Sequence, residues 1–320
     1  MSALNVKAEH FTRSVPREAA QAIFKSSVTQ VEIEVFTYCN RKCWFCPNSY
    51  IDRKSKNIYM DEDLYLRILL ELGSIDYCGV ITYSRYNEPL ADRIILTRLR
   101  QARELVPNAI LSTHTNGDYL HREYLEELKD SGLNRLRVQT YLGNKTKFSD
   151  TRILTRMSRQ LNRLGFPYEF TMVSPGVRYM AKVRVRGMEV TVDARNFDVI
   201  GVDRGQTIAL PQTYNRVSPC LVVFQHLYID YDGSIVPCCN IRSDEPRHKQ
   251  YVVDKLVDGK TIFEVYANSS LADWRRSLLT YGKKKPPCDT CSYEALPDNA
   301  DLRATTNAIA LRYGINNREP

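Results

Sequence analysis

Three closely spaced cysteines are the residues of this chain best suited to chemistry. Cys39, Cys43 and Cys46 form a Cys-x-x-x-Cys-x-x-Cys pattern. Three thiolates at this spacing can each bind one iron of a 4Fe-4S cluster while a short loop wraps around it, so the fourth iron lacks a protein ligand. Such an open iron can bind a small molecule, which makes the cluster reactive. A zinc site would prefer four ligands arranged as Cys-x-x-Cys pairs.

A second group of cysteines lies toward the C-terminus. Cys220 precedes and Cys238 ends a segment with a hairpin pattern, and Cys288 and Cys291 form a Cys-x-x-Cys pair. Because the N-terminus has no apolar signal core, these spacings favour metal binding over disulfides. Four such ligands can converge on one cluster or on one zinc ion, and the spacing leaves both alternatives open. Cys239 directly follows a predicted ligand and could exchange roles with Cys238.

Alternating strand and helix patterns must position these groups. A strand is expected at residues 31–36, ending at the first cysteines, and others at 80–83, 109–114, 136–140 and 168–173. Helices are expected between them at residues 92–105, 123–131 and 151–164. Regular repetition of strand and helix implies parallel strands with covering helices, wound as a barrel or an open sheet.

The pattern changes after Pro175. Residues 182–192 alternate around Gly187 as a hairpin does, and Asp232-Gly233 lies between two further apolar runs. One amphipathic helix is expected at residues 262–279. A domain boundary is therefore expected near residues 175–200. Cys78, beside the second strand, is expected in the core.

Composition and charge exclude some functions. The 320 residues include 45 Lys and Arg against 37 Asp and Glu, a net charge of +8. One interpretation is an anionic substrate; the other is solubility together with compensation for thiolate-bound clusters. No dense basic stripe is apparent along the sequence, so a nucleic-acid partner is not expected. No apolar run approaches the ~20 residues that span a bilayer, and a cytoplasmic protein is expected.

The first cysteine motif, with aromatic Phe45 before its last cysteine, resembles the signature of the radical S-adenosylmethionine (radical SAM) superfamily. This resemblance implies an α/β fold with a partial parallel (β/α)6 barrel. It also implies SAM bound to the open iron of the first 4Fe-4S cluster, with Phe45 among the contacts. Reductive cleavage of SAM then yields a 5′-deoxyadenosyl radical that abstracts hydrogen from substrate. A flavodoxin or ferredoxin is expected as reductant by the same analogy.

Polar residues that follow the predicted strands match SAM-binding positions of the superfamily. Tyr86, Asn87 and Glu88 stand where the family has a Gly-Gly-Glu-like motif, although its glycines are absent. A carboxylate such as Glu88 suits the ammonium group of SAM. The resemblance also implies a ribose contact at Asn116, after the third strand, and a cofactor contact at Gln139, at the end of the fourth.

The later cysteines resemble the Twitch domain, a shortened SPASM domain that carries one auxiliary 4Fe-4S cluster. This resemblance implies a small C-terminal α+β domain in which Cys220, Cys238, Cys288 and Cys291 bind that cluster. The expected domains are an N-terminal extension at residues 1–27, a radical SAM core at 28–180, a connecting hairpin and loop at 181–215, the Twitch-like domain at 216–295 and a tail at 296–320.

Within the superfamily, the chain is most specifically similar to dehydrogenases of the 2-deoxy-scyllo-inosamine type. The similarity rests on residues 39–49 (CNRKCWFCPNS), Glu88-Pro89-Leu90, residues 115–120 (TNGDYL), residues 145–148 (KTKF) and the four late cysteines. It implies hydrogen abstraction from a hydroxyl-bearing carbon of a sugar- or cyclitol-like substrate, with the auxiliary cluster as electron acceptor.

Arg204 matches the proton acceptor proposed in that family. Arginine is a poor base, with a pKa above ~12, but a cation can assist deprotonation of a radical's acidic hydroxyl. The alternative is a structural arginine that organises its loop.

The chain departs from that family at Cys239 and Asn240, where relatives have an aromatic residue and a glutamate. Loss of the carboxylate weakens the case for an amine-bearing substrate. The thiol introduces a rival reaction, redox-neutral epimerisation of a sugar-type carbon as in neomycin C epimerase, with Cys239 as hydrogen-atom donor. Two other classes are a peptide-modifying SPASM-type maturase, which usually has an additional N-terminal domain, and a non-catalytic metal-binding protein.

Overall fold

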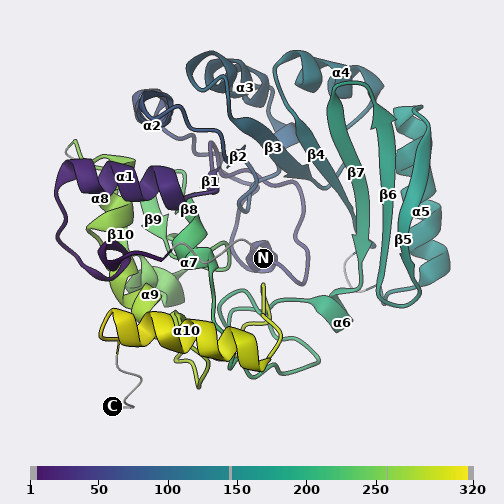
Figure 1. The fold of residues 1–320 in the computed structure, drawn as a ribbon. Coiled ribbons are helices and arrows are strands. Elements are labelled where there is room, and N and C mark those ends of the chain that lie inside the picture. Colours follow the sequence, from purple (N-terminus) through teal and green to yellow (C-terminus); the bar gives the residue numbers. More distant parts are fainter. Residues whose placement is uncertain (1–5, 144–145, 258, 316–320) are drawn as a thin grey trace. The chain divides into compact units, whose positions relative to one another are not determined.

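The computed structural model describes residues 6–143, 146–257 and 259–315 (Figure 1). The chain divides into two compact units. The core unit comprises Glu32–Gly201 and Leu210–Gln212. The C-terminal unit comprises Met1–Val31, Val202–Ala209 and Thr213–Pro320. The predicted N-terminal extension at residues 1–27 therefore groups with the C-terminal part of the chain, and its residues 1–5, like residues 316–320 of the predicted tail, lie outside the described residues.

The core unit is built on a mixed sheet with the strand order β2-β3-β4-β7-β6-β5. Its strands are β2 (Val80–Thr82), β3 (Ile110–Thr115), β4 (Arg135–Thr140), β5 (Tyr168–Ser174), β6 (Arg178–Val185) and β7 (Met188–Arg195), and β1 (Gln30–Ile33) leads into the unit. β2 pairs in parallel with β3, β3 with β4, and β4 with β7. Parallel strands end at one edge of a sheet, so the loops that follow them lie near one another.

The strand predicted at residues 168–173 is present, but its expected place in the parallel series is wrong. β5 pairs antiparallel with β6, and β6 antiparallel with β7, so β5 forms the edge of the sheet. The reason is the connection: only three residues separate β5 from β6, whereas a parallel crossover needs a dozen or more. The hairpin predicted around Gly187 is confirmed as β6 and β7, and β7 rather than β5 is the parallel neighbour of β4.

Four helices connect the core strands. They are α2 (Glu62–Ser74), α3 (Ile94–Leu105), α4 (Arg122–Asp130) and α5 (Asp150–Leu164). Asp61 caps α2 by accepting a hydrogen bond from the Leu64 amide at 3.0 Å. Gly165, with φ of 68°, ends α5 in the left-handed conformation that favours glycine. α3 packs on β3, and α5 packs on β4 and β7.

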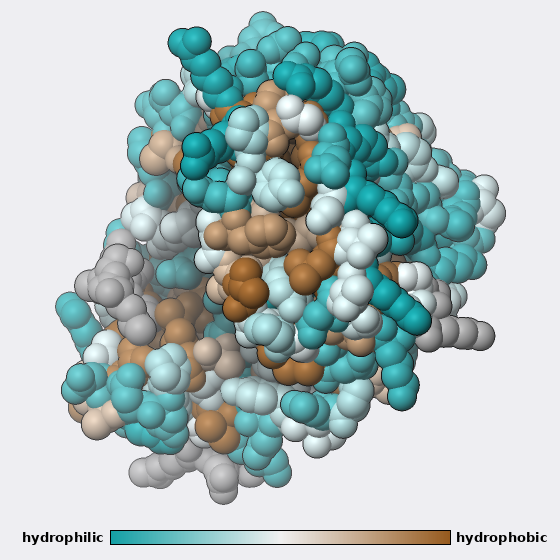
Figure 2. Space-filling view, turned by 90° about the vertical axis from the view of Figure 1, so that its right-hand side faces the viewer, coloured by the Kyte–Doolittle hydropathy of each residue, from teal (hydrophilic) through white to brown (hydrophobic). Residues whose placement is uncertain are grey.

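The edge strand β5 leaves apolar side chains exposed. Tyr168, Phe170, Met172 and Val173 all lie at the surface. Figure 2 shows the side of the molecule that carries β5 and α5, where hydrophobic residues lie among hydrophilic ones. The helices therefore bury the middle of the core sheet more completely than its β5 edge.

The C-terminal unit combines a small antiparallel sheet with short helices. Its elements are α1 (Arg17–Ser27), α7 (Val222–Gln225), β8 (His226–Ile229), β9 (Ser234–Val236), β10 (Asp254–Lys255), α8 (Ile262–Ala267), α9 (Leu271–Leu278) and α10 (Ala300–Arg312). The predicted hairpin at Asp232-Gly233 is confirmed as β8 and β9, which β10 extends. α1 packs on α8. Short 3-10 helices complete the two units at Ala8–Phe11, Pro47–Ser49, Pro89–Ala91 and Pro246–Tyr251, and a single-turn helix α6 lies at Phe197–Ile200.

The single helix predicted at residues 262–279 is wrong, because the structure breaks it into α8 and α9 at Asn268–Ser270. The Asn268 side chain bonds the backbone of Val15 twice, accepting from its N–H at 2.7 Å and donating to its carbonyl at 3.2 Å. Asn and Ser side chains compete with the helix for backbone hydrogen bonds, which favours a break here. None of the helices described is long and apolar enough to cross a membrane.

Candidate functional site

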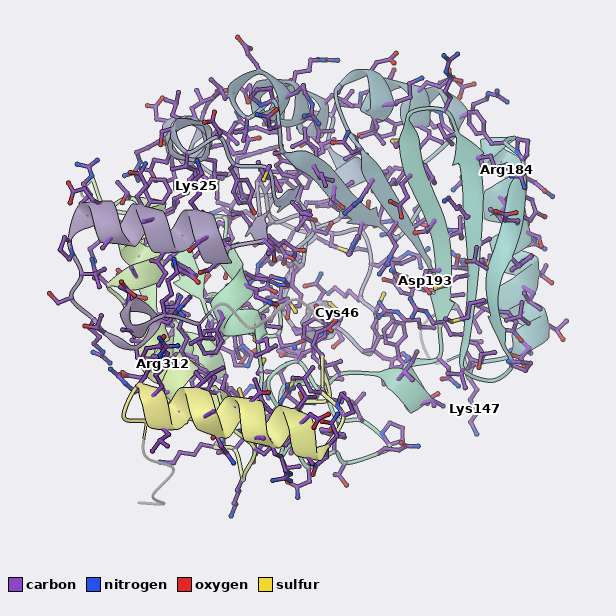
Figure 3. All side chains as sticks on the ribbon, in the orientation of Figure 1. Lys25, Cys46, Lys147, Arg184, Asp193 and Arg312 are labelled. Atoms are coloured by element: carbon purple, nitrogen blue, oxygen red, sulfur yellow. The ribbon has the colours of Figure 1, made fainter. Side chains whose placement is uncertain are left out.

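The first cysteine group lies in the loop between β1 and the 3-10 helix at Pro47–Ser49. Cys39, Cys43 and Cys46 are each partly buried, and Cys46 is labelled in Figure 3. Burial raises the pKa of Cys39 and of Cys43 to about 12, with smaller contributions from Glu88 and Cys46 at Cys39 and from the other two thiols at Cys43. The three sulfurs therefore occupy one region, and iron would have to replace their protons.

A buried ion pair holds this loop in place. Arg53 contacts Glu34 at 3.0 Å and also donates to the Thr37 carbonyl at 3.1 Å. The backbone carbonyl of Arg53 accepts from the Cys39 amide at 3.1 Å. Glu34 in turn accepts from the Tyr86 amide at 3.1 Å, which ties the cysteine loop to the loop after β2. Sequence reasoning missed this pair, although an acidic residue within the apolar run VEIEVF was a signal that a buried partner exists.

Glu88 lies in the loop after β2, completely surrounded by protein. One carboxylate oxygen accepts from the Leu90 amide at 3.1 Å and from the Thr115 hydroxyl, and the other from the Asn116 amide at 2.7 Å. Burial raises its pKa to about 7, although these hydrogen bonds oppose the shift. The carboxylate therefore keeps acceptor capacity at Oε2 for a cationic group such as an ammonium.

The neighbouring Asn87 supplies an observation that fits a bound cofactor. Its Nδ2 is buried and has no hydrogen-bond partner among the described residues, while its Oδ1 accepts from the Arg85 amide at 3.2 Å. An orphaned buried donor beside an available carboxylate suits a ligand that carries both a carboxylate and an ammonium group, as an amino acid does. The residues at this place therefore fit the methionine end of SAM.

Phe45 belongs to an aromatic pocket. Its ring stacks on Phe197, with centroids 3.6 Å apart and planes within 3°, and Tyr141 lies 5.0 Å away. The adjoining pocket is lined by these rings and by Trp44. Flat aromatic faces suit a purine base.

Two further predicted SAM contacts, Asn116 and Gln139, are already engaged with protein. Asn116 Nδ2 donates to Asn40 in the cysteine loop at 2.7 Å. Gln139 accepts from Arg195 at 3.1 Å and lies 3.5 Å from buried Asp193 on β7. The structure thus brings Glu88 and Asn116 together and places Gln139 in the β4–β7 polar network, whose Asp193 is labelled in Figure 3. Their contacts with SAM stay predictions.

The raised pKa of Glu88 predicts that the affinity for SAM depends on pH. Because the raised pKa of about 7 means that the carboxyl is protonated below that pH, SAM affinity is expected to rise as pH increases through about 7. Below it, the dissociation constant should increase by up to about tenfold per pH unit. Calorimetric titration of SAM into the reconstituted protein between about pH 6 and about pH 8 measures this slope. Glu88→Gln should bind weakly with a flat profile, and an unchanged slope in that variant would contradict the assignment.

The four late cysteines surround one cavity in the C-terminal unit. Cys220, Cys238, Cys288 and Cys291 line it together with apolar residues that include Trp274. Burial raises the pKa of each thiol. Among the described residues, no three His, Cys, Asp or Glu side chains converge as the ligands of a single metal ion would. Four thiols around a mostly apolar cavity suit a cluster, whose cysteines bind different iron atoms.

Arg216 joins the two segments that carry these cysteines. Its guanidinium is fully buried and donates to five backbone carbonyls. These are Pro219 at 2.6 Å and Ser218 at 3.2 Å, before Cys220, and Tyr293 at 2.6 Å, Cys291 at 3.2 Å and Glu294 at 3.3 Å, at and after the Cys-x-x-Cys pair. Lys284 is a second buried cation here, and burial followed by Arg216 lowers its pKa to about 8. Both cations favour an anionic occupant such as a thiolate-bound cluster.

Arg204 lies in an unusual turn of the same unit. Arg204, Gly205 and Gln206 are three successive residues in the left-handed region, with φ of 52°, 63° and 66°. Each non-glycine residue there costs about 1–2 kcal/mol, so surrounding contacts must hold the turn. Its Asp203 accepts from Thr290 at 2.6 Å, and Gln206 donates to Asp289 at 2.7 Å.

The contacts of Arg204 connect it with the late cysteines. Arg204 Nη1 donates to Asn240 at 3.1 Å, and Asn240 Nδ2 lies 3.9 Å from the Cys291 sulfur. The turn is therefore attached both to the residues after Cys238 and to the loop between Cys288 and Cys291. Sequence reasoning selected Arg204 but missed these anchors, since they are 36 to 87 positions away along the chain.

The remaining cysteines differ in their surroundings. Cys238 lines the cavity, whereas Cys239 is half-buried outside its lining, which favours Cys238 as the ligand. Cys78, expected in the core, is exposed instead. β2 begins only at Val80, so Cys78 precedes the strand and has no position in the sheet that would bury it.

Comparison with known families identifies the class of both units. The radical SAM superfamily model matches residues 33–159, and the SPASM iron–sulfur cluster-binding domain matches residues 220–292. The chain therefore carries a radical SAM domain followed by a SPASM domain. SAM and two 4Fe-4S clusters are consistent with this combination and with both cysteine groups.

Two curated enzymes and one solved structure show which members of these families the chain is similar to. The chain is 36% identical over 120 residues to the S-adenosyl-L-methionine-dependent 2-deoxy-scyllo-inosamine dehydrogenase of Niallia circulans. The aligned segment covers 38% of this chain and about half (48%) of that enzyme. It is 28% identical over 121 residues to the GTP 3′,8-cyclase of Nautilia profundicola, 36% of either protein. The crystal structure of BtrN with AdoMet and 2-DOIA has the same fold, with a TM-score of 0.57 and 21% identity over 83% of this chain and 92% of BtrN.

Proposed function

We propose that this protein is a radical SAM oxidoreductase that dehydrogenates a hydroxyl-bearing carbon of a sugar- or cyclitol-like substrate. The observation that carries the proposal is the four-thiol cavity around Cys220, Cys238, Cys288 and Cys291, in a chain that also carries the three-cysteine loop. An alcohol oxidation needs a second redox site for the last electron, and this cavity fits one. The similarity to a cyclitol dehydrogenase supports the substrate class.

Oxidation of the carbinol to a carbonyl removes one hydrogen atom, one proton and one electron. When bound, SAM and the first cluster supply the radical that takes the hydrogen atom, and the auxiliary cluster takes the electron. The protein orients SAM through Glu88 and Asn87. Arg204, held by Asn240, assists departure of the hydroxyl proton. Water is kept from the cysteine cavity by the side chains of Trp274, Leu278 and Val223.

Epimerisation is the second candidate function. Cys239 directly follows a predicted ligand and lies outside the lining of the cysteine cavity. Such a thiol can return a hydrogen atom to a carbon radical, and no electron then needs to leave the substrate. The two functions differ in their product: dehydrogenation gives a ketone, whereas epimerisation gives an alcohol with inverted configuration.

The test is anaerobic turnover of reconstituted protein with SAM, a strong reductant and a panel of cyclitols and sugar alcohols. Dehydrogenation predicts one 5′-deoxyadenosine per ketone formed, and Cys239→Ala should retain ketone formation. Epimerisation predicts solvent deuterium at an inverted carbon, which Cys239→Ala should abolish. Cys78→Ala, at an exposed thiol, is the matched control. Failure to cleave SAM would overturn both candidates, and modification of a ribosomal peptide would assign the protein to the maturases.

A further inference from the structure

Helix α5 carries a row of arginines that the proposed reaction does not use. Arg152, Arg156, Arg159 and Arg163 recur at intervals of four, three and four residues, which places them on one face of the helix. They line an open groove together with Asp118. The row extends for about 16 Å at 1.5 Å per residue. The sequence showed no dense basic stripe because the arginines are separated along the chain and meet only through the helical repeat.

The groove carries an excess of positive charge. Asp118 is already held by Arg41, whose Nε donates at 2.6 Å, and by Asn40 at 2.8 Å, and Arg156 lies 3.8 Å from it. Arg152 and Arg159 make no hydrogen bond or ion pair with any residue that the structure describes. Burial and the neighbouring arginines also lower the pKa of Arg156, although Asp118 opposes this shift. A negatively charged partner would relieve this repulsion.

The position of the groove indicates which partner would use it. Arg41 lies between Cys39 and Cys43, and its bond to Asp118 joins the cysteine loop to the groove wall. Under the proposed function, an electron must reach the cluster at this loop from outside the chain. A row of about 16 Å is longer than one phosphate group and matches an extended acidic surface.

We propose that the arginine face of α5 is the docking surface for an acidic electron-carrier protein that reduces the cluster held by the Cys39–Cys46 loop. In this step the carrier is oxidised by one electron and the cluster is reduced by one. The inference rests on the proposed function. Because the attraction is electrostatic, docking weakens as added salt shortens the screening length, which is about 10 Å at 0.1 M.

The test uses the reconstituted full chain with an acidic flavodoxin as the probe. Arg152→Glu with Arg159→Glu reverses two charges that make no hydrogen bond or ion pair with the described residues. The variant should lower the second-order rate of flavodoxin-driven SAM cleavage by about tenfold or more at low salt and remove most of its salt dependence. Cleavage driven by titanium(III) citrate should stay at the wild-type rate. Arg100→Glu with Arg186→Glu, at exposed positions elsewhere in the core unit, is the matched control and should behave as wild type.

Other outcomes overturn the proposal in distinguishable ways. An unchanged flavodoxin-driven rate in the α5 variant would exclude this surface, as would an equal loss in the matched control. Equal loss with titanium(III) citrate would show damage to the cluster site. Competition by micromolar pyrophosphate without any effect of charge reversal on the flavodoxin rate would assign the groove to a small anion. If wild-type protein cleaves no SAM with titanium(III) citrate, the proposed function fails, whatever binds the groove.

Discussion

Replacing Cys39, Cys43 and Cys46 together with alanine is expected to abolish reductive SAM cleavage while leaving the auxiliary site loaded. The three thiols share one loop of the core unit, whereas the four late cysteines line a cavity of the C-terminal unit. Each set therefore has its own supporting contacts, Glu34 and Arg53 for the first and Arg216 for the second. Reconstituted iron should fall from about eight to about four per chain.

The measurement combines iron and sulfide analysis with detection of 5′-deoxyadenosine. Cys78→Ala should retain about eight irons and full cleavage, since this thiol is exposed and belongs to neither cysteine group. Residual SAM cleavage in the triple variant would contradict the assignment of the first site. Loss of all iron would contradict the independence of the two sites.

Arg216→Gln is expected to prevent loading of the auxiliary site and to destabilise the C-terminal unit. The substitution removes a buried guanidinium that donates to five carbonyls on both cysteine segments. Buried carbonyls left without a donor cost about 1–3 kcal/mol each, so a loss of about 3 kcal/mol or more in the free energy of unfolding is expected. The iron content should fall to about four per chain, and SAM cleavage at the first site should persist.

A matched control separates this role from general destabilisation. Arg275 is an equally buried arginine of the same unit, donating to the Val223 carbonyl at 3.0 Å, but it does not line the cysteine cavity. Arg275→Gln should lower the unfolding midpoint in denaturant yet retain the second cluster. Arg216→Lys should recover part of the loading, because lysine keeps the positive charge but lacks the planar guanidinium that donates to several carbonyls at once. Equal iron loss in both glutamine variants would contradict a specific role of Arg216 in cluster loading and would indicate a general structural role.

The two buried cations at the auxiliary site, Arg216 and Lys284, should also raise the midpoint potential of its cluster. A buried cation beside four thiolates favours the more negatively charged, reduced cluster. Lys284 adds a second positive charge, and its neutral replacement by methionine should move the midpoint potential in the negative direction. Redox titration followed by electron paramagnetic resonance, in the triple cysteine variant that lacks the first cluster, measures this shift directly. A positive shift would contradict the electrostatic interpretation.

Short-range patterns in the sequence predict the ligands of two clusters, which stay predictions, and most of the core strands, which the structure confirms. The seven expected cluster ligands lie at spacings of a few residues, or at the ends of a recognisable hairpin, so local geometry limits what they can bind. Strand and helix periodicity placed β2, β3 and β4 within one residue of their observed bounds. Local patterns failed where competing contacts came from far along the chain, as at Asn268, which bonds Val15 and breaks the predicted helix.

The sequence by itself therefore determined the class of chemistry, because ligand type and spacing are properties of a few consecutive residues. Only the tertiary structure decided which residues support that chemistry. Arg216 reaches carbonyls up to 78 positions away, and the left-handed turn at Arg204 depends on Asn240 and Thr290. The arginine face of α5 arises because 3.6 residues make one helical turn, so side chains scattered in the sequence meet on one surface.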